Sequence, residues 1–129
     1  AANAFIAAGE PGRAEEMLDK CQRVLKPKEY PYDNSILGWG SNALFPIEMI
    51  KDYYALGKPE KAKALAQELT NELTESIRFY LDFYPMCKSD FEYNCNLIYY
   101  MTNDVIRKAG DNEFADEIEK SLAAFLSAQ

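Results

Sequence analysis

The sequence predicts an all-α fold of three helical hairpins, about six helices in one domain that spans residues 1–129. The first observation is a glycine followed by an alanine five residues later, and this spacing occurs three times. The pairs are Gly9 and Ala14, Gly57 and Ala62, and Gly110 and Ala115 (14−9, 62−57 and 115−110). Such a glycine can take the left-handed conformation that ends a helix, and the small alanine lets two helices cross closely. The second observation is that apolar residues recur every three or four positions, and no stretch alternates as a strand does.

The first hairpin joins residues 2–8, a short helical segment, to a second helix over residues 11–25. Apolar residues of the second helix share one face, at Ala14, Met17, Leu18, Cys21, Val24 and Leu25. Residues 26–41 contain two prolines and two glycines, which exclude a continuous helix. Their large apolar side chains argue against a disordered linker, so we expect an ordered crossover packed by its aromatic residues.

The second hairpin joins residues 44–56 to the longest helix, residues 59–84. Pro46 and Pro59 are tolerated only in a first turn, so they set the two starts, and Pro85 stops the second helix. Residues 79–84 are apolar on nearly every side. We therefore expect this end to be covered by neighbouring elements or to meet a partner.

The third hairpin begins with Ser89 and Glu92, which fit a capping box opening a fifth helix. The expected buried face of that helix consists of Phe91, Cys95, Ile98, Met101, Val105 and Ala109. Gly110 ends the helix and Asp111 can cap the sixth. The sixth helix is anchored by Ile118, Leu122, Phe125 and Leu126.

Composition excludes several classes of function. The formal charge of −7, with no basic cluster, argues against nucleic acid and anionic lipid surfaces as partners. The absence of histidine removes the commonest general base and metal ligand. Cys21, Cys87 and Cys95 form no CxxC pair, so we expect buried or half-buried thiols, although a Cys87–Cys95 disulfide is conceivable. No apolar run reaches the roughly 20 residues that span a bilayer.

Catalytic candidates are few, and we expect no catalytic residue, metal site or cofactor. Glu48 and Asp52 lie four residues apart on one helix face and could serve as a glycosidase pair. The alternative, a solvated helix surface, fits the usual exposure of acidic residues. Serine catalysis lacks its histidine, and no glycine-rich phosphate loop is present.

Aromatic residues offer a possible partner-binding surface. Tyr30, Tyr32 and Trp39 lie in the crossover, and Tyr54 and Tyr99 belong to adjacent tyrosine pairs on helices. A tyrosine-lined groove could bind a peptide or stack on a sugar. The alternative is that these residues pack in the core and rim of a helical array.

The second hairpin resembles the tetratricopeptide repeat. The resemblance rests on an aromatic before the turn and small residues after it, at Tyr53, Leu56, Gly57, Ala62, Ala66 and Leu69. The first hairpin agrees at Phe5, Gly9, Ala14, Leu18 and Cys21, whereas the third has Glu119 where a small or apolar residue is expected. The glycines are 48 and 53 residues apart (57−9 and 110−57), beyond the family's usual 34, so the array is tetratricopeptide-like.

A narrower resemblance covers residues 14–21, 30–33, 53–57 and 77–81. They look like the soluble C-terminal region of a bacterial multi-pass membrane protein family of unassigned function, similar to protein O-mannosyltransferases. The Tyr-Pro-Tyr-Asp motif at residues 30–33 is the most telling part. The catalytic carboxylates of that family would lie in its membrane part, so none is carried onto this chain.

This resemblance implies a non-catalytic protein-interaction module that binds a protein or peptide. The module would be a fragment of a larger protein, attached to the membrane only through a preceding part, with the periplasmic side slightly favoured. The alternative is a free-standing helical protein that binds a glycan or small ligand.

Overall fold

A computed structural model of the chain describes residues 9–25 and 44–128, with side chains from residue 44 on and, in the first segment, up to residue 21. Within these residues all regular structure is helical, as predicted. The chain divides into two compact units, residues 1–66 and 67–129, which we call the N-terminal and C-terminal units. The expected helix over residues 2–8 and the crossover lie outside the described residues, and the single-domain boundary stays a prediction.

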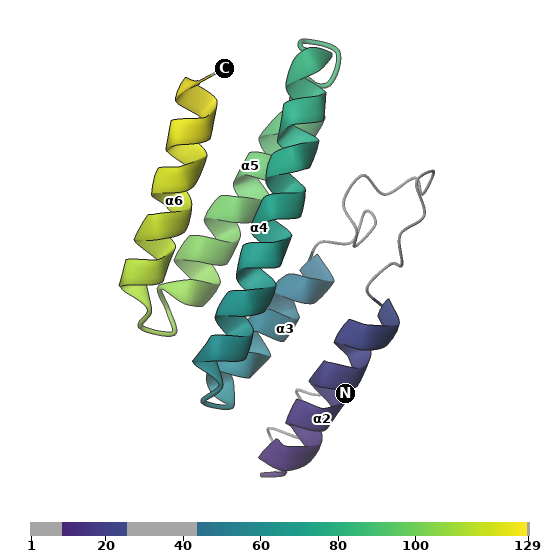
Figure 1. The fold of residues 1–129 in the computed structure, drawn as a ribbon, viewed down its shortest axis with the longest axis vertical. Coiled ribbons are helices and arrows are strands. Elements are labelled where there is room, and N and C mark those ends of the chain that lie inside the picture. Colours follow the sequence, from purple (N-terminus) through teal and green to yellow (C-terminus); the bar gives the residue numbers. More distant parts are fainter. Residues whose placement is uncertain (1–8, 26–43, 129) are drawn as a thin grey trace. The chain divides into compact units, whose positions relative to one another are not determined.

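Figure 1 shows the helices α2 (Pro11–Leu25), α3 (Leu44–Ala55) and α4 (Pro59–Asp82). The N-terminal unit contains α2, α3 and the first turns of α4. Gly9 and Gly57 have φ values of 75° and 72°, the left-handed conformation predicted for such turns. The Lys58 N–H donates to the Tyr53 carbonyl at 2.9 Å and closes the α3–α4 turn. The core of this unit consists of Ala14, Leu18, Ile47, Met49, Ile50, Tyr53, Ala62, Leu65 and Ala66.

The C-terminal unit contains the rest of α4, α5 (Lys88–Tyr100), the π-helix η1 (Met101–Ile106) and α6 (Asn112–Ser127). Gly110 has a φ of 93° and turns the chain from η1 toward α6. The buried apolar residues are Leu69, Leu73, Ile77, Leu97, Ile98, Met101, Val105, Ile106, Ala115, Ile118 and Leu122. They recur at helical spacing on each element, so the unit is held by an apolar core between its helices.

The predicted capping box at Ser89 and Glu92 is wrong. The N-cap of α5 is Cys87, without a side-chain capping bond, and the helix begins at Lys88. The Cys87 N–H donates to the Phe83 carbonyl and the Lys88 N–H to the Pro85 carbonyl, each at 3.1 Å. These bonds continue the turn after α4 into α5, so the helix starts before Ser89 and Ser89 is not its N-cap. Asp111 does occupy the N-cap of α6, but its side chain makes no capping bond.

The predicted buried face of the fifth helix is only partly right. The buried residues of α5 and η1 are Asn94, Leu97, Ile98, Met101, Thr102, Val105 and Ile106. Phe91 and Cys95 are half-buried and Ala109 is exposed. In η1 the Arg107 N–H donates to the Thr102 carbonyl five residues earlier, at 2.9 Å. Because the π turn holds more residues than an α turn, the buried pairs 97–98, 101–102 and 105–106 recur every four residues, and a period of 3.6 extended from Phe91 to Ala109 loses their register.

All three cysteines are free and half-buried, as expected. Cys87 and Cys95 lie at the N-cap and within α5, eight residues apart on one helix (95−87). At 1.5 Å per residue this separates them by about 12 Å, beyond the roughly 7 Å that a disulfide can bridge. The conceivable Cys87–Cys95 disulfide is therefore incompatible with this helix.

Candidate functional site

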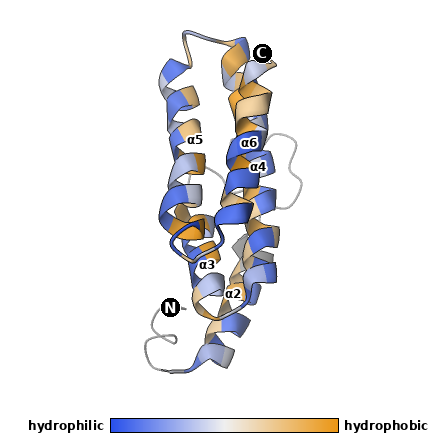
Figure 2. Cartoon of the chain, turned by 90° about the vertical axis from the view of Figure 1, so that its left-hand side faces the viewer, coloured by the Kyte–Doolittle hydropathy of each residue, from blue (hydrophilic) through white to orange (hydrophobic). Residues whose placement is uncertain are grey.

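The end of the C-terminal unit where α4 turns into α5 carries a cluster of exposed apolar side chains. We call Phe79, Phe83, Tyr84 and Met86 the apolar end. Their exposed fractions are 43%, 49%, 52% and 88%. Figure 2 shows hydrophobic residues at the end of this unit where α6 ends. Large apolar residues gathered in this way on a protein surface often mark an interaction site.

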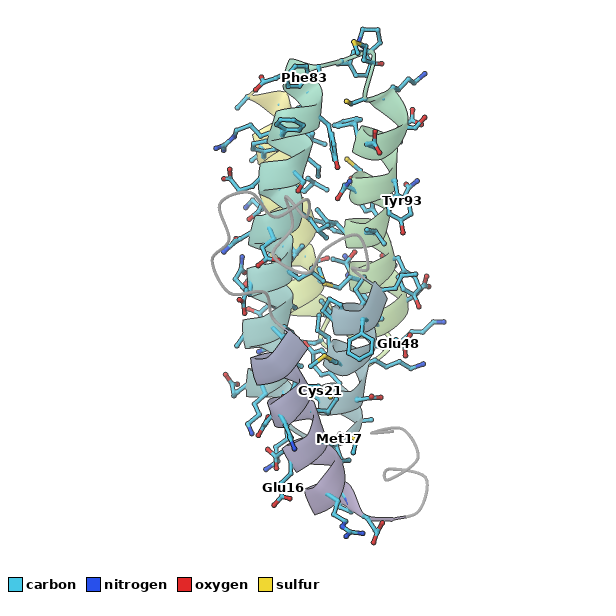
Figure 3. The ribbon with its side chains drawn as sticks, turned by 90° about the vertical axis from the view of Figure 1, so that its right-hand side faces the viewer. Glu16, Met17, Cys21, Glu48, Phe83 and Tyr93 are labelled. Atoms are coloured by element: carbon cyan, nitrogen blue, oxygen red, sulfur yellow. The ribbon has the colours of Figure 1, made fainter. Side chains whose placement is uncertain are left out.

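The last turns of α4 position the apolar end. Phe79 and Phe83 lie one helical turn apart, and their ring centroids are 5.0 Å from each other. Tyr84 meets the half-buried Phe91 edge-on at 6.4 Å, which ties the start of α5 to the end of α4. Figure 3 shows Phe83 at this end and Tyr93 farther along α5. Residues 79–84 carry large apolar side chains around most of the chain's circumference. A neighbouring helix can bury only the side that it packs against, so some of these side chains stay exposed.

The apolar end has an uncharged centre. Residues 83–87 contain no charged side chain, and the exposed Asp82 and Lys88 flank them. The Arg78 guanidinium pairs with Glu75 at 3.3 Å and lies over the Phe125 ring at 5.4 Å. An apolar centre with charged residues at its rim is the usual anatomy of a protein-binding patch.

Two of the five partner-binding residues named from sequence lie within the described part of the chain. Tyr30, Tyr32 and Trp39 lie outside the described residues. Tyr54 is half-buried in the N-terminal unit, and Tyr99 is 39% exposed in the C-terminal unit. The surface that these five residues would form stays a prediction.

Asp52 does not lie on a solvated helix surface, so that expectation is wrong for one of the two acids. Asp52 is only 6% exposed, and Glu48 is half-buried. Burial raises the pKa of Asp52 above its ordinary value of 3.8, and the nearby Glu48 charge raises it further. A raised carboxyl pKa is one requirement of a general acid. It also accompanies simple burial in a packed helix, so it does not by itself assign a catalytic role.

A charged cluster joins the three helices of the N-terminal unit. The Tyr53 hydroxyl donates to Asp19 Oδ1 at 2.6 Å, and Lys61 Nζ lies 2.7 Å from Glu15 Oε2 and 2.9 Å from Asp19 Oδ2. Burial and then the Asp19 bond raise the pKa of Tyr53, and the bonds to Glu15 and Asp19 raise the pKa of Lys61. At neutral pH Tyr53 is therefore a neutral donor and Lys61 an ammonium ion. Neither is poised as a nucleophile, and the cluster fastens α2 to α3 and α4.

A second polar network lies in the C-terminal unit. It includes Glu119, which stands where the repeat pattern predicts a small or apolar residue. The buried Thr102 hydroxyl lies 2.8 Å from Glu119 Oε1. Arg107 Nη2 lies 3.3 Å from the same oxygen and 2.6 Å from Asp116 Oδ1. The departure from the repeat pattern at Glu119 thus coincides with a link between η1 and α6.

Among the residues whose positions are described, no three histidine, cysteine, aspartate or glutamate side chains are grouped so that they could hold a metal ion. In the same part of the chain, no helix combines the length and apolar character that crossing a membrane requires. Comparison with protein-family models, curated proteins and solved structures found no match.

Proposed function

We propose that this chain is a non-catalytic protein-interaction module and that the apolar end of its C-terminal unit contacts the partner. The observation that carries the proposal is the exposure of Phe79, Phe83, Tyr84 and Met86 on one hairpin end. Contact with a partner would remove this apolar area from water, which favours binding by about 25 cal/mol per Å² before the costs of association.

The chemistry of the described polar groups also favours binding over catalysis. Tyr53 and Lys61 keep their protons at neutral pH and serve contacts between helices. Glu119 and Arg107 are engaged with each other and with neighbours in the C-terminal unit. The raised pKa of Asp52 accompanies its burial within α3. These assignments leave the exposed aromatic and methionine side chains as the surface best suited to a function.

The resemblance of residues 14–21, 30–33, 53–57 and 77–81 supports a further part of the proposal. The module would be the soluble C-terminal appendage of a multi-pass membrane protein similar to glycosyltransferases. Sequencing the coding DNA upstream of Ala1 tests this part. Several long apolar segments encoded there would support the attachment to a membrane protein. A start codon close to the codon for Ala1 would contradict it.

Site-specific photocrosslinking in the source cells tests the interaction surface. A benzophenone amino acid would replace Phe83, just after the end of α4, in one variant and the exposed Asn71 of α4 in a control variant. We expect a discrete protein adduct from position 83 and none from position 71. Equal adducts from both positions, or none from position 83, would refute the apolar end as the contact surface.

The partner identified in this way can then be purified and its affinity measured. Replacing Met86, which is 88% exposed, by serine should weaken binding at least tenfold while the helical circular dichroism signal stays unchanged. Such a loss corresponds to about 1.4 kcal/mol, which is typical of an interface residue that contributes to binding.

A further inference from the structure

The π-helix η1 holds a polar side chain among the apolar residues of the C-terminal core. Thr102 is fully buried, and its hydroxyl has one proton but two acceptors within reach. The Tyr99 carbonyl lies at 3.1 Å and Glu119 Oε1 at 2.8 Å. The carboxylate is charged and is the stronger acceptor, so the proton is directed toward α6.

Glu119 occupies a position that is apolar in the other two hairpins. Leu18 and Ala66 stand four residues after their hairpin alanines (18−14, 66−62), as Glu119 does after Ala115 (119−115). Leu18 is 2% exposed and Ala66 0%, whereas the Glu119 side chain is 28% exposed. A carboxylate in place of a packed apolar side chain is costly unless it is hydrogen-bonded. The Glu119 contacts with Thr102 and Arg107 meet that condition.

The register of η1 decides which side of α5 is exposed. In the π-helical register the Arg107 N–H reaches the Thr102 carbonyl at 2.9 Å. In an α-helical register it would reach the Asn103 carbonyl instead, four residues earlier. Tightening the turn from an i→i−5 to an i→i−4 hydrogen bond rotates the helix before it, relative to the helix after it, by roughly the angular step of one residue, about 100°. Tyr93 and Tyr99, which are 52% and 39% exposed on α5, would then face a different direction.

We infer that the contacts of Glu119 with Thr102 and Arg107 form a register lock, which keeps residues 101–106 π-helical and so fixes the exposed tyrosine side of α5. Loss of the lock allows the segment to become α-helical and turns that side. The lock stands independently of any partner. Only its consequence for binding rests on the proposed interaction function.

The register can be read directly by NMR on the full 129-residue chain. A long-range HNCO experiment detects coupling through a hydrogen bond and identifies which carbonyl accepts from the Arg107 amide. Two variants remove the lock, namely Thr102→Val, which keeps the side-chain shape, and Glu119→Leu, which introduces the residue found at position 18. The matched control is Glu117→Leu, the same change at an exposed position of α6.

We expect Thr102 as the acceptor in the wild type and in Glu117→Leu. In the two lock variants the acceptor should move to Asn103, and the Arg107 amide should exchange with solvent roughly tenfold faster. Two results would overturn the inference. One is Asn103 as the wild-type acceptor, and the other is Thr102 retained in both lock variants with unchanged exchange. If Glu119→Leu fails to fold, the near-isosteric Thr102→Val decides the question.

These measurements need no partner, so their failure is distinct from failure of the proposed function. If a partner is later found on α5, a lock variant should weaken its binding while leaving contacts at the apolar end unchanged.

Discussion

Replacing Ala62 by leucine tests whether the alanine after each turn glycine lies at a close helix crossing. Ala62 is fully buried in the first turn of α4. Leucine adds three carbon atoms where no solvent-exposed space exists, so neighbouring side chains or helices must shift. Overpacking of this kind costs about 1–3 kcal/mol in the free energy of unfolding.

The control for Ala62→Leu is Ala64→Leu, the same substitution at an exposed position two residues later. Alanine and leucine differ little in helix propensity, so this variant should lie within about 0.5 kcal/mol of the wild type. Urea denaturation followed by circular dichroism gives both free energies from the midpoint and slope of each transition. Equal stability of the two variants would show that Ala62 does not lie at a close crossing.

Three further predictions concern stability. Tyr53→Phe removes the hydroxyl that donates to Asp19 at 2.6 Å and should cost about 1.5 kcal/mol, the lower range for a bond to a charged acceptor. A double-mutant cycle with Asp19→Asn checks it, and a coupling energy near zero would exclude a stabilising bond. Asp52→Asn should raise the free energy of unfolding at pH 7. The raised pKa of Asp52 contributes stability that is fully present below pH 3.8 and is lost as the pH rises through the pKa of the folded state. Asparagine does not titrate, so the variant does not lose stability in this way. Urea titrations from pH 4 to 8 should show the advantage growing with pH, and a constant difference would contradict it. Gly57→Ala should cost about 1–2 kcal/mol because φ is 72°, although no atom lies within 4 Å of the added carbon. Gly12→Ala, inside α2, should instead stabilise by roughly 0.5–1 kcal/mol, and thermal melts showing the same sign for both would refute the distinction.

Features that depend on neighbouring residues in the chain could be predicted from the sequence. The bounds predicted for α2 are those observed, and α3 and α4 end within two residues of the predicted positions. The left-handed conformation of Gly57 follows from a turn whose hydrogen bonds are all local. Helical periodicity and glycine conformation are properties of a few adjacent residues, which a single sequence records directly.

Features that depend on distant contacts could not be predicted. The π-helix η1 is linked to α6 by the Thr102–Glu119 contact, whose residues are 17 apart in sequence. A regular period of 3.6 therefore placed Ala109 on the buried face, where it is not. Asp52 was expected to be solvated, because sequence spacing does not reveal which neighbours cover a helix face.

The candidate site was only partly foreseen. The run of apolar residues at 79–84 indicated that the end of α4 would be covered or would meet a partner. Met86 was not singled out, because a methionine in a short turn carries no periodic signal. The tyrosines chosen instead were selected by residue type, and their exposure depends on packing that a sequence does not specify.

The most direct test of the interaction proposal compares two apolar residues of similar exposure. Phe83 is 49% exposed at the apolar end, and Leu44 is 47% exposed at the start of α3. With the partner found by crosslinking, we expect Phe83→Ser to raise Kd by about thirtyfold, corresponding to roughly 2 kcal/mol, and Leu44→Ser to change it less than twofold. Equal effects of the two substitutions, or no effect of Phe83→Ser in a folded variant, would contradict binding through the apolar end.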